Sequence, residues 1–178
     1  MATAINDLST QMFEAEAMLF TRTGERLRVR PVRPGDRAAI ANFFQHVTSE
    51  DLRFRFLTSL REVGDKRLDD ICRTDYPTAM TFVAFVANEL VALASLAGQA
   101  AGRIEVALTT LPQWKAHGIS WTLLDHAIRF ASEHGAKEIV SVERCDNRAA
   151  INLEHEMGFG IRVLDAGNGE VIAIKSLR

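Results

Sequence analysis

The sequence is poor in the residues that mark several classes of protein. Only two of its 178 residues are cysteines, Cys72 and Cys145, and they stand far apart in no metal-binding spacing. We therefore expect reduced thiols in a cytosolic protein, and no metal site. The 21 Lys and Arg residues are balanced by 23 Asp and Glu residues. This balance argues against a nucleic-acid-binding surface, because such a surface needs an excess of positive charge.

Long hydrophobic runs are also missing. No apolar stretch approaches the ~20 residues that a membrane-spanning helix needs. Residues 1–8 lack the basic start and the apolar core of a secretory signal. With 47% hydrophobic and 25% charged residues, the composition is that of a globular protein. We expect one cytoplasmic domain, monomeric or homodimeric, that binds neither a membrane nor nucleic acid.

The order of the predicted elements is typical of an α+β fold. Residues 1–16 show no strong pattern and are assigned to an N-terminal extension, whereas residues 17–178 form the predicted domain. Asp36 and Thr48 are each expected to cap the start of a helix. A long helix is expected after Pro112, and another helix after Asn147. The predicted strands cover residues 18–20, 27–29, 81–87, 90–96, 104–109, 138–142, 160–164 and 171–177.

The most informative segment is a strand, a loop and a helix start between Glu105 and Ser120. Small residues at Ala116, Gly118 and Ser120 would let a ligand come close to the backbone. The first N–H groups of the helix have no partner within it and, with the helix dipole, form an anion site suited to a pyrophosphate. The loop has neither the Walker spacing nor the Rossmann glycine pattern, so neither NTP hydrolysis nor NAD binding is indicated. A purely structural loop remains the alternative.

A second motif lies about thirty residues further along and makes the first one more specific. Asn147 is followed by Ala150, Leu153 and then Gly158-Phe159. With the loop Lys115-Ala116-His117-Gly118-Ile119-Ser120, this spacing resembles the GNAT superfamily of N-acetyltransferases over residues 17–178. The segment 30–36 is similar to the first strand and turn of that family. The leading hairpin, the stretch at residues 49–54 and Glu105 resemble most the acetyltransferase domain of bacterial protein lysine acetyltransferases.

The resemblance implies a fold, a cosubstrate and a set of binding residues. The fold would be a single domain with a central, mixed but mostly antiparallel, twisted sheet and helices on both faces. The cosubstrate would be acetyl-CoA, with its pyrophosphate on the loop amides and its pantetheine arm and thioester carbonyl on the backbone of Ala107, Leu108 and Thr109. The predicted binding residues are Ala107, Leu108, Thr109, Lys115, Ala116, His117, Gly118, Ile119, Ser120 and Asn147. Asn147 has a second interpretation as a plain helix cap.

The chain departs from the family pattern at three positions. Lys115 replaces the usual Gln or Arg at the start of the loop, and Ser120 replaces the usual Gly or Ala at its end. Glu154 stands where many relatives carry a tyrosine that serves as general acid, and the only tyrosine, Tyr76, lies elsewhere. The protein-acetylating branch often lacks that tyrosine too.

Glu105 is the predicted catalytic base. A carboxylate on a strand that faces a cleft can take a proton from an ammonium group, directly or through water. The alternative is a salt bridge on an exposed strand face. The basic and aromatic segment Arg53-Phe54-Arg55-Phe56 has two interpretations. It forms one wall of the acceptor site, or its phenylalanines belong to the core and its arginines are exposed to solvent around them. Cys145 is interpreted as a packing residue, since no base is evident beside it.

The sequence thus predicts an enzyme, an acetyl-CoA-dependent N-acetyltransferase that transfers the acetyl group directly to an amine. The resemblance favours a protein lysine as the acceptor, and a small amine remains open. Two alternatives are kept: a weak or inactive acyl-CoA-binding regulatory module, and a structural or dimer-forming domain without a ligand.

Overall fold

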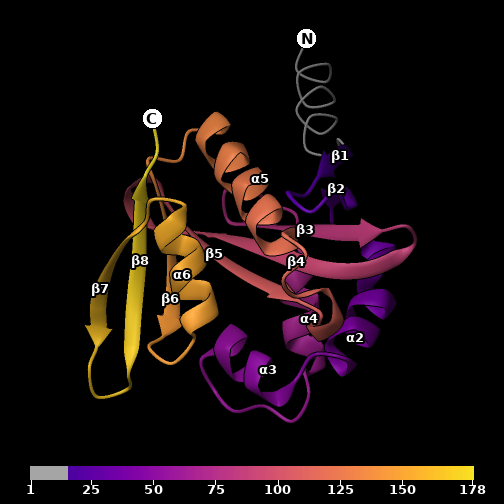
Figure 1. Ribbon diagram of the computed structural model, residues 1–178, viewed down its shortest axis with the longest axis horizontal. Helices are drawn as coiled ribbons and strands as arrows, with labels where there is room; N and C mark the ends of the chain where they lie inside the picture. Colours follow the sequence, from indigo (N-terminus) through magenta and orange to yellow (C-terminus); the bar gives the residue numbers. More distant parts are fainter. Residues whose placement is uncertain (1–15) are drawn as a thin grey trace.

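Eight strands form one open sheet in the computed structural model, which describes residues 16–178 (Figure 1). Residues 1–15, nearly all of the predicted N-terminal extension, lie outside this description. The strands are β1 (Ala17–Phe20), β2 (Arg26–Pro31), β3 (Ala79–Val86), β4 (Glu89–Gly98), β5 (Arg103–Thr110), β6 (Glu138–Arg144), β7 (Gly160–Asp165) and β8 (Glu170–Ser176). The α-helices are α2 (Arg37–Gln45), α3 (Ser49–Phe56), α4 (Asp65–Ile71), α5 (Ile119–Glu133) and α6 (Arg148–Glu156).

The sheet is mixed and mostly antiparallel, as predicted. Its strand order is β1-β2-β3-β4-β5-β6-β8-β7, and the strands β1 to β5 form successive antiparallel pairs. Among the described strands only β5 and β6 pair in parallel. A parallel connection needs a crossover, and α5 supplies it.

Both faces of the central strands β3 and β4 are buried, which explains why these strands are predominantly apolar. Successive side chains on β3 point to opposite faces. Phe82 and Ala84 belong to a core shared with α5, whereas Val83 and Phe85 belong to a second core shared with α2 and α4. The predicted helices on both faces are therefore confirmed. Figure 1 shows α5 across the middle of the sheet and α2 at its other side.

Asp36 is the N-cap residue of α2, as predicted, but its carboxylate does not accept from the first turn of that helix. Its carboxylate accepts two hydrogen bonds of 2.7 Å from the Arg30 guanidinium and one from the backbone N–H of Arg33. Arg30 is buried, so the paired carboxylate compensates its charge. This ion pair lowers the pKa of Asp36, against the opposing effect of burial. The Thr48 cap is confirmed, because its hydroxyl accepts from the backbone N–H of Asp51.

Helix α4 was not predicted from the sequence. Five of its seven residues are charged, and only Leu68 and Ile71 are apolar and buried. Its N-cap is Gly64, which has no side chain to form a cap. A short, highly charged helix carries too weak an apolar pattern to be recognised, and tertiary packing against α2 stabilises it.

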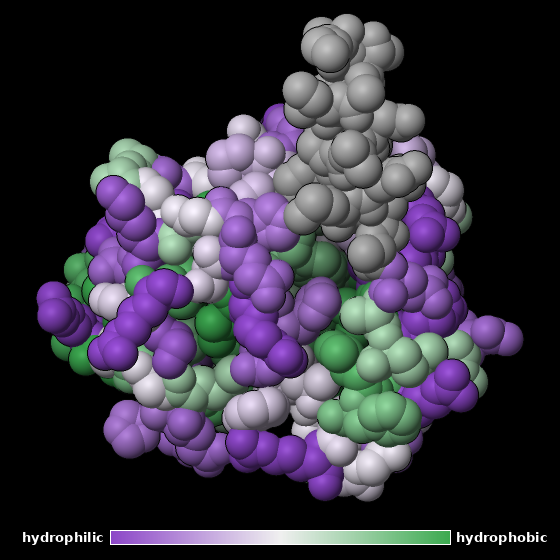
Figure 2. Space-filling view, turned by 90° about the horizontal axis from the view of Figure 1, so that it is seen from above, coloured by the Kyte–Doolittle hydropathy of each residue, from purple (hydrophilic) through white to green (hydrophobic). Residues whose placement is uncertain are grey.

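The surface is mostly hydrophilic, with apolar side chains gathered in separate areas. Figure 2 shows one face, where hydrophilic residues interrupt the apolar ones. The exposed large apolar side chains are Met18 and Phe20 on β1 and Val163 and Leu164 on β7. Both strands are at the edges of the sheet, so these residues lie far from the central strands.

Candidate active site

A cleft opens where β5 and β6 separate. Their pairing begins at Arg103–Glu138 and ends at Glu105–Val140, although both strands continue beyond it. The resulting cavity, which we call the β5–β6 cleft, measures about 380 Å³. It is lined by Asp51, Phe54, Arg55, Ala107, Leu108, Thr109, Thr110, Lys115, Ala116, Gly118, Ile119, Ser120, Trp121, Leu124, Val142, Glu143, Asn147, Ala149, Ala150, Leu153 and Glu154.

One edge of β5 faces this cleft without a neighbouring strand. Ala107, Leu108 and Thr109 pair only with β4 within the described sheet. Backbone polar groups need partners, so the free edge can accept an extended ligand. The Thr109 hydroxyl is buried and finds no hydrogen-bond partner among residues 16–178, although Thr109 lines the cleft. These groups can bind a polar chain laid along β5.

The start of α5 points its free amides at the same cleft. The N–H of Thr122 is the first in the helix to reach an intrahelical acceptor, the carbonyl of Gly118. The N–H groups of Ile119, Ser120 and Trp121 therefore have no intrahelical partner. All three residues line the cleft. Together with the helix dipole, these amides form a site for an anion.

The loop before α5 is bent by two residues with positive φ, Ala116 at +63° and Gly118 at +74°. The sequence predicts that Gly118 lets a ligand come close to the backbone. The structure gives a different reason for glycine there. An added Cβ would lie 3.3 Å from Cβ of Thr21 and 3.4 Å from N of Arg22, on the side of the β1–β2 turn.

Gly118→Ala is therefore expected to lower the free energy of unfolding by about 1–2 kcal/mol, because a Cβ in the left-handed region is strained and Thr21 must shift. Urea denaturation measures this. The control is Gly64→Ala, where φ is −71° and an added Cβ meets nothing within 4 Å. Equal losses in the two variants would contradict the interpretation.

The side chains of Lys115 and His117 in the loop point in different directions. Lys115 lines the cleft, but its Nζ lies 2.7 and 2.8 Å from the two carboxylate oxygens of Asp51 on α3. His117 is absent from the cleft lining, its Nδ1 lies 3.5 Å from Glu25, and its ring packs against Trp114. Its carbonyl accepts from Thr23. The structure thus brings Lys115 to the cleft, already paired, and turns the His117 side chain away.

Ser120 and Asn147 both reach the cleft and both are engaged. The Ser120 hydroxyl is 3.0 Å from the Thr110 hydroxyl. The side-chain oxygen Oδ1 of Asn147 accepts a hydrogen bond from the backbone N–H of Ala150, so Asn147 caps α6. The Asn147 amide donates to Glu143 at 2.6 Å. Asn147 therefore caps α6 and also orients a carboxylate that lines the cleft.

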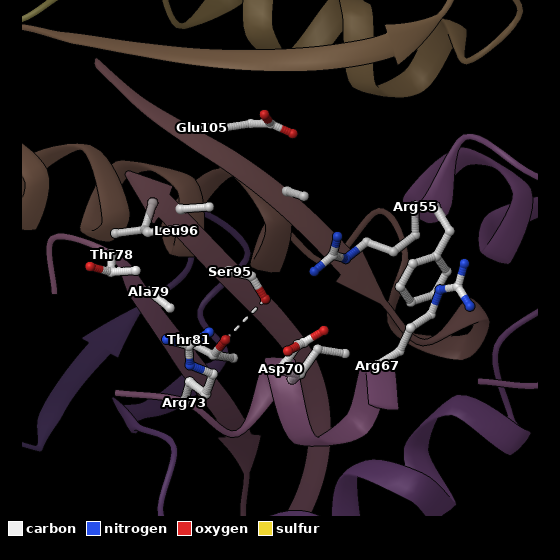
Figure 3. Close-up of a pocket in the computed structure, with 14 residues that line it drawn as sticks. Arg55, Arg67, Asp70, Arg73, Thr78, Ala79, Thr81, Ser95, Leu96 and Glu105 are labelled. Atoms are coloured by element: carbon white, nitrogen blue, oxygen red, sulfur yellow. Dashed lines mark hydrogen bonds between the residues drawn. The ribbon is translucent and has the colours of Figure 1, made fainter. Parts of the chain in front are cut away.

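A second cavity, of about 450 Å³, adjoins the first (Figure 3). We call it the arginine hollow, after the three arginines of its wall. It is lined by Arg55, Phe56, Arg67, Asp70, Ile71, Arg73, Thr78, Ala79, Thr81, Ser95, Leu96, Ala97, Glu105 and Ala107. Glu105 extends from β5 on one side of the hollow, and Arg55 and Arg67 lie on the other (Figure 3). Gln99 holds the Glu105 carboxylate by donating a hydrogen bond of 2.6 Å.

Arg55 and Ala107 line both cavities and so mark their junction. The Nε of Arg55 is buried without a hydrogen-bond partner in the described part of the chain. Burial lowers the pKa of Arg55 to about 10, against the attraction of Glu105 and Glu143. The guanidinium is still charged at neutral pH. Arg55 therefore lines both cavities and is not a solvated rim, whereas Arg53 pairs with Asp146.

Two carboxyls of the cleft were missed as functional residues. Glu143 lies on β6 and accepts from Ser141 and Asn147. Burial raises the pKa of Glu143, against the effect of those hydrogen bonds. Burial and the neighbouring Glu143 carboxylate raise the pKa of Glu154 to about 8. Glu154 is buried in α6 beside the half-buried Leu153, and a charged residue among the apolar positions of a helix is the signal that could have revealed it.

The sequence comparisons agree with this geometry. Residues 44–159 match the acetyltransferase (GNAT) family, and the chain belongs to that family. A Pseudomonas aeruginosa acetyltransferase is 29% identical over 141 residues, which are 76% of each chain. The chain is thus an acetyltransferase of the GNAT type.

Solved structures share the fold. The GNAT domain of PAT from S. lividans superposes with a TM-score of 0.85 at 22% identity, over 91% of this chain and 97% of that one. Spermidine N-acetyltransferase from Vibrio cholerae, in complex with CoA and spermine, gives a TM-score of 0.67 at 17% identity, over 84% of this chain and 95% of that one. No helix in residues 16–178 has the length and apolarity to cross a membrane.

Proposed function

We propose that this acetyltransferase takes the acetyl group from acetyl-CoA bound in the β5–β6 cleft and transfers it directly to an amine in the arginine hollow. The observation that carries the proposal is the meeting of the two cavities at Ala107 and Arg55. A donor and an acceptor bound in adjoining cavities can react without a covalent enzyme intermediate.

Three groups of the cleft fit acetyl-CoA. The amides of Ile119, Ser120 and Trp121 would bind the pyrophosphate. The free edge of β5 at Ala107, Leu108 and Thr109 would pair with the pantetheine arm and polarise the thioester carbonyl. The Thr109 hydroxyl, buried without a partner among the described residues, would gain one. The spermidine acetyltransferase of the same fold was crystallised with CoA, which supports the cosubstrate.

Glu105 would act on the acceptor. It lines the arginine hollow and not the cleft, so it faces the amine and not the acetyl-CoA. Its hydrogen bond from Gln99 fixes one carboxylate oxygen. An amine that enters as an ammonium ion must lose a proton before it attacks, and Glu105 would accept that proton, directly or through water.

The charges on the wall of the arginine hollow indicate which kind of acceptor it can bind. Arg55, Arg67 and Arg73 face Asp70 and Glu105, so guanidinium groups outnumber carboxylates. Such a wall opposes a polyamine and favours an amine accompanied by a negative group, such as a lysine near an acidic or terminal carboxylate. A protein lysine in that setting is the acceptor we propose.

The test is a calorimetric titration with acetyl-CoA, followed by a screen of Nα-acetyl-lysine, its carboxamide, lysine peptides with acidic or basic neighbours, and spermidine. We expect binding, and faster transfer to the anionic member of each pair. Binding without transfer to any amine would favour the regulatory-module alternative, and no binding would leave a structural domain.

The pair between Asp51 and Lys115 gives a separate prediction. Because Asp51 neutralises the lysine beside the predicted phosphate site, Asp51→Asn is expected to tighten acetyl-CoA binding by about threefold to tenfold and to steepen its salt dependence. Lys115→Gln is expected to weaken acetyl-CoA binding, because the Asp51 carboxylate then lies beside the phosphate site without its cation. Calorimetry at two salt concentrations measures both. Unchanged affinity in the two variants would place this pair away from the ligand.

A further inference from the structure

The carboxyl of Glu154 is buried in the wall of the β5–β6 cleft. Glu154 is only 4% exposed, and its Oε2 has no hydrogen-bond partner within residues 16–178. Asn147, Ala150 and Glu154 are spaced three and four residues apart on α6, so they share one helix face, and all three line the cleft. Glu154 therefore faces the cleft across from β5.

The charges around Glu154 disfavour its ionised form. On β6, the Glu143 carboxylate repels it, and Ser141 offers a hydroxyl that only partly offsets this. On β8, the Lys175 ammonium donates to the carbonyl of Met157 at 2.7 Å. On α3, Arg55 interacts with Glu143. No cation is paired with Glu154 among the ion pairs of the described chain.

The cleft also connects Glu154 to the junction of the two cavities. Glu143 interacts electrostatically with both Arg55, which marks the junction, and Glu154. Thr109 on β5 and Glu154 on α6 both line the cleft, and each has a buried polar atom, the hydroxyl and Oε2, without a hydrogen-bond partner in the described structure. Buried polar groups are normally satisfied, so this pair indicates that a ligand supplies the partners.

We propose that Glu154 is the proton donor to the departing sulfur of acetyl-CoA. This inference rests on the proposed function. Glu154 gives its carboxyl proton to the sulfur while the carbon–sulfur bond breaks and the electron pair stays on sulfur. The amine nitrogen first loses one proton of its ammonium form to water through Glu105, then attacks the thioester carbon, so that a nitrogen–carbon bond replaces the carbon–sulfur bond. The second proton that the nitrogen loses goes to Glu105, which returns it to water. The products are the amide and the free thiol, and the Glu154 carboxylate regains a proton from water.

The acidity of Glu154 suits this step. A carboxyl with a pKa of about 8 is mostly protonated at pH 7, whereas an ordinary glutamate has already lost its proton. Proton transfer is most efficient when the pKa of the donor is near the working pH, and thiols have a pKa of about 8.5. An exposed glutamate with an ordinary pKa would have no proton to donate to the sulfur at pH 7.

The test compares Glu154→Gln, Glu154→Asp and the unmodified protein, with acetyl-CoA and Nα-acetyl-lysine as probes. Glutamine keeps the shape but has no carboxyl proton to give. We expect kcat at pH 7 to fall about 10- to 100-fold in Glu154→Gln, with an acetyl-CoA Kd within about threefold, and partial recovery in Glu154→Asp. The unmodified protein should lose activity above about pH 8, and Glu154→Gln should lack that fall. The matched control is Glu156→Gln, an exposed carboxylate on the same helix.

Two measurements test the protonation of Glu154 without an activity assay. Carbon-13 NMR of labelled glutamate should show one carboxyl that titrates near pH 8 and is missing in Glu154→Gln. Because the folded-state pKa lies above the unfolded value, the folded protein binds the extra proton between about pH 4.5 and 8, so its stability should decrease as pH rises through that window. Glu154→Gln should lack this decrease.

The failures are distinguishable. If the unmodified protein neither binds acetyl-CoA nor acetylates an amine, the proposed function fails. If it is active but Glu154→Gln has the same kcat and the same loss of activity at alkaline pH, the proton-donor role is overturned. Titration of Glu154 near pH 4.5 would overturn it as well, whether or not the probe amine is a substrate.

Discussion

Glu105→Gln is expected to lower turnover by about 10²- to 10⁴-fold while acetyl-CoA affinity stays unchanged. The reason is the separation of the two cavities. Glu105 lines only the arginine hollow, so its loss leaves the cleft intact. A lysine side chain has a pKa of about 10.4, and without a base only its small neutral fraction can react.

The pH dependence makes this prediction sharper. Between pH 6 and 8 the neutral fraction of a lysine amine rises about tenfold for each pH unit. Turnover by Glu105→Gln should follow that rise, whereas the unmodified protein should change less steeply. The control is Glu138→Gln on β6, which removes a carboxylate paired with Arg103 outside both cavities. A Glu105→Gln protein with native turnover across this range would make Glu105 structural.

Ser120→Asp is expected to weaken acetyl-CoA binding by at least about 100-fold. Ser120 is at the second position of α5 and lines the cleft, so the new carboxylate would stand where the pyrophosphate is proposed to bind. An aspartate in the first turn interacts favourably with the helix dipole, so the fold should not suffer. Loss of binding would therefore report repulsion between two anions and not unfolding.

The matched control is Ser120→Asn. Asparagine has nearly the size of aspartate and can also hydrogen-bond to Thr110, but it carries no charge. Its acetyl-CoA Kd should stay within a few-fold of that of the unmodified protein. Calorimetry on the unmodified protein, Ser120→Asp and Ser120→Asn separates the effect of the added charge on acetyl-CoA binding from the effect of the larger side chain. Equal weakening by Asp and Asn would show a steric effect, and no weakening by Asp would place the pyrophosphate elsewhere.

The parts of the fold that carry a regular pattern could be predicted from the sequence. The strand from Arg103 to Thr110, the long helix α5 and the hairpin around Asn88-Glu89 all lie within one or two residues of their predicted places. These elements are long or strongly apolar, so local pattern and tertiary packing agree. Asp36 stands at its predicted N-cap position, but its carboxylate pairs with Arg30 on another element, and no cap motif reveals such a pair.

The site was predictable where it depends on the backbone and not where it depends on contacts across the fold. The loop before α5 follows from local order, whereas the binding role of the β5 backbone came from the family resemblance, and its free edge depends on where β6 leaves β5. The pairing of Lys115 with Asp51 joins residues 64 positions apart, and the burial of Glu154 depends on how α6 packs against β7 and β8. Neither the direction of the His117 side chain nor the position of Arg55 between two cavities has a signature in the local sequence.

The most direct measurement is the crystal structure of the protein with acetyl-CoA bound. We expect pyrophosphate oxygens about 2.7–3.2 Å from the backbone nitrogens of Ile119, Ser120 or Trp121, and an acetyl group beside Ala107, between Glu105 and Glu154. A pyrophosphate away from the start of α5, or an acetyl group distant from the junction of the two cavities, would contradict this expectation.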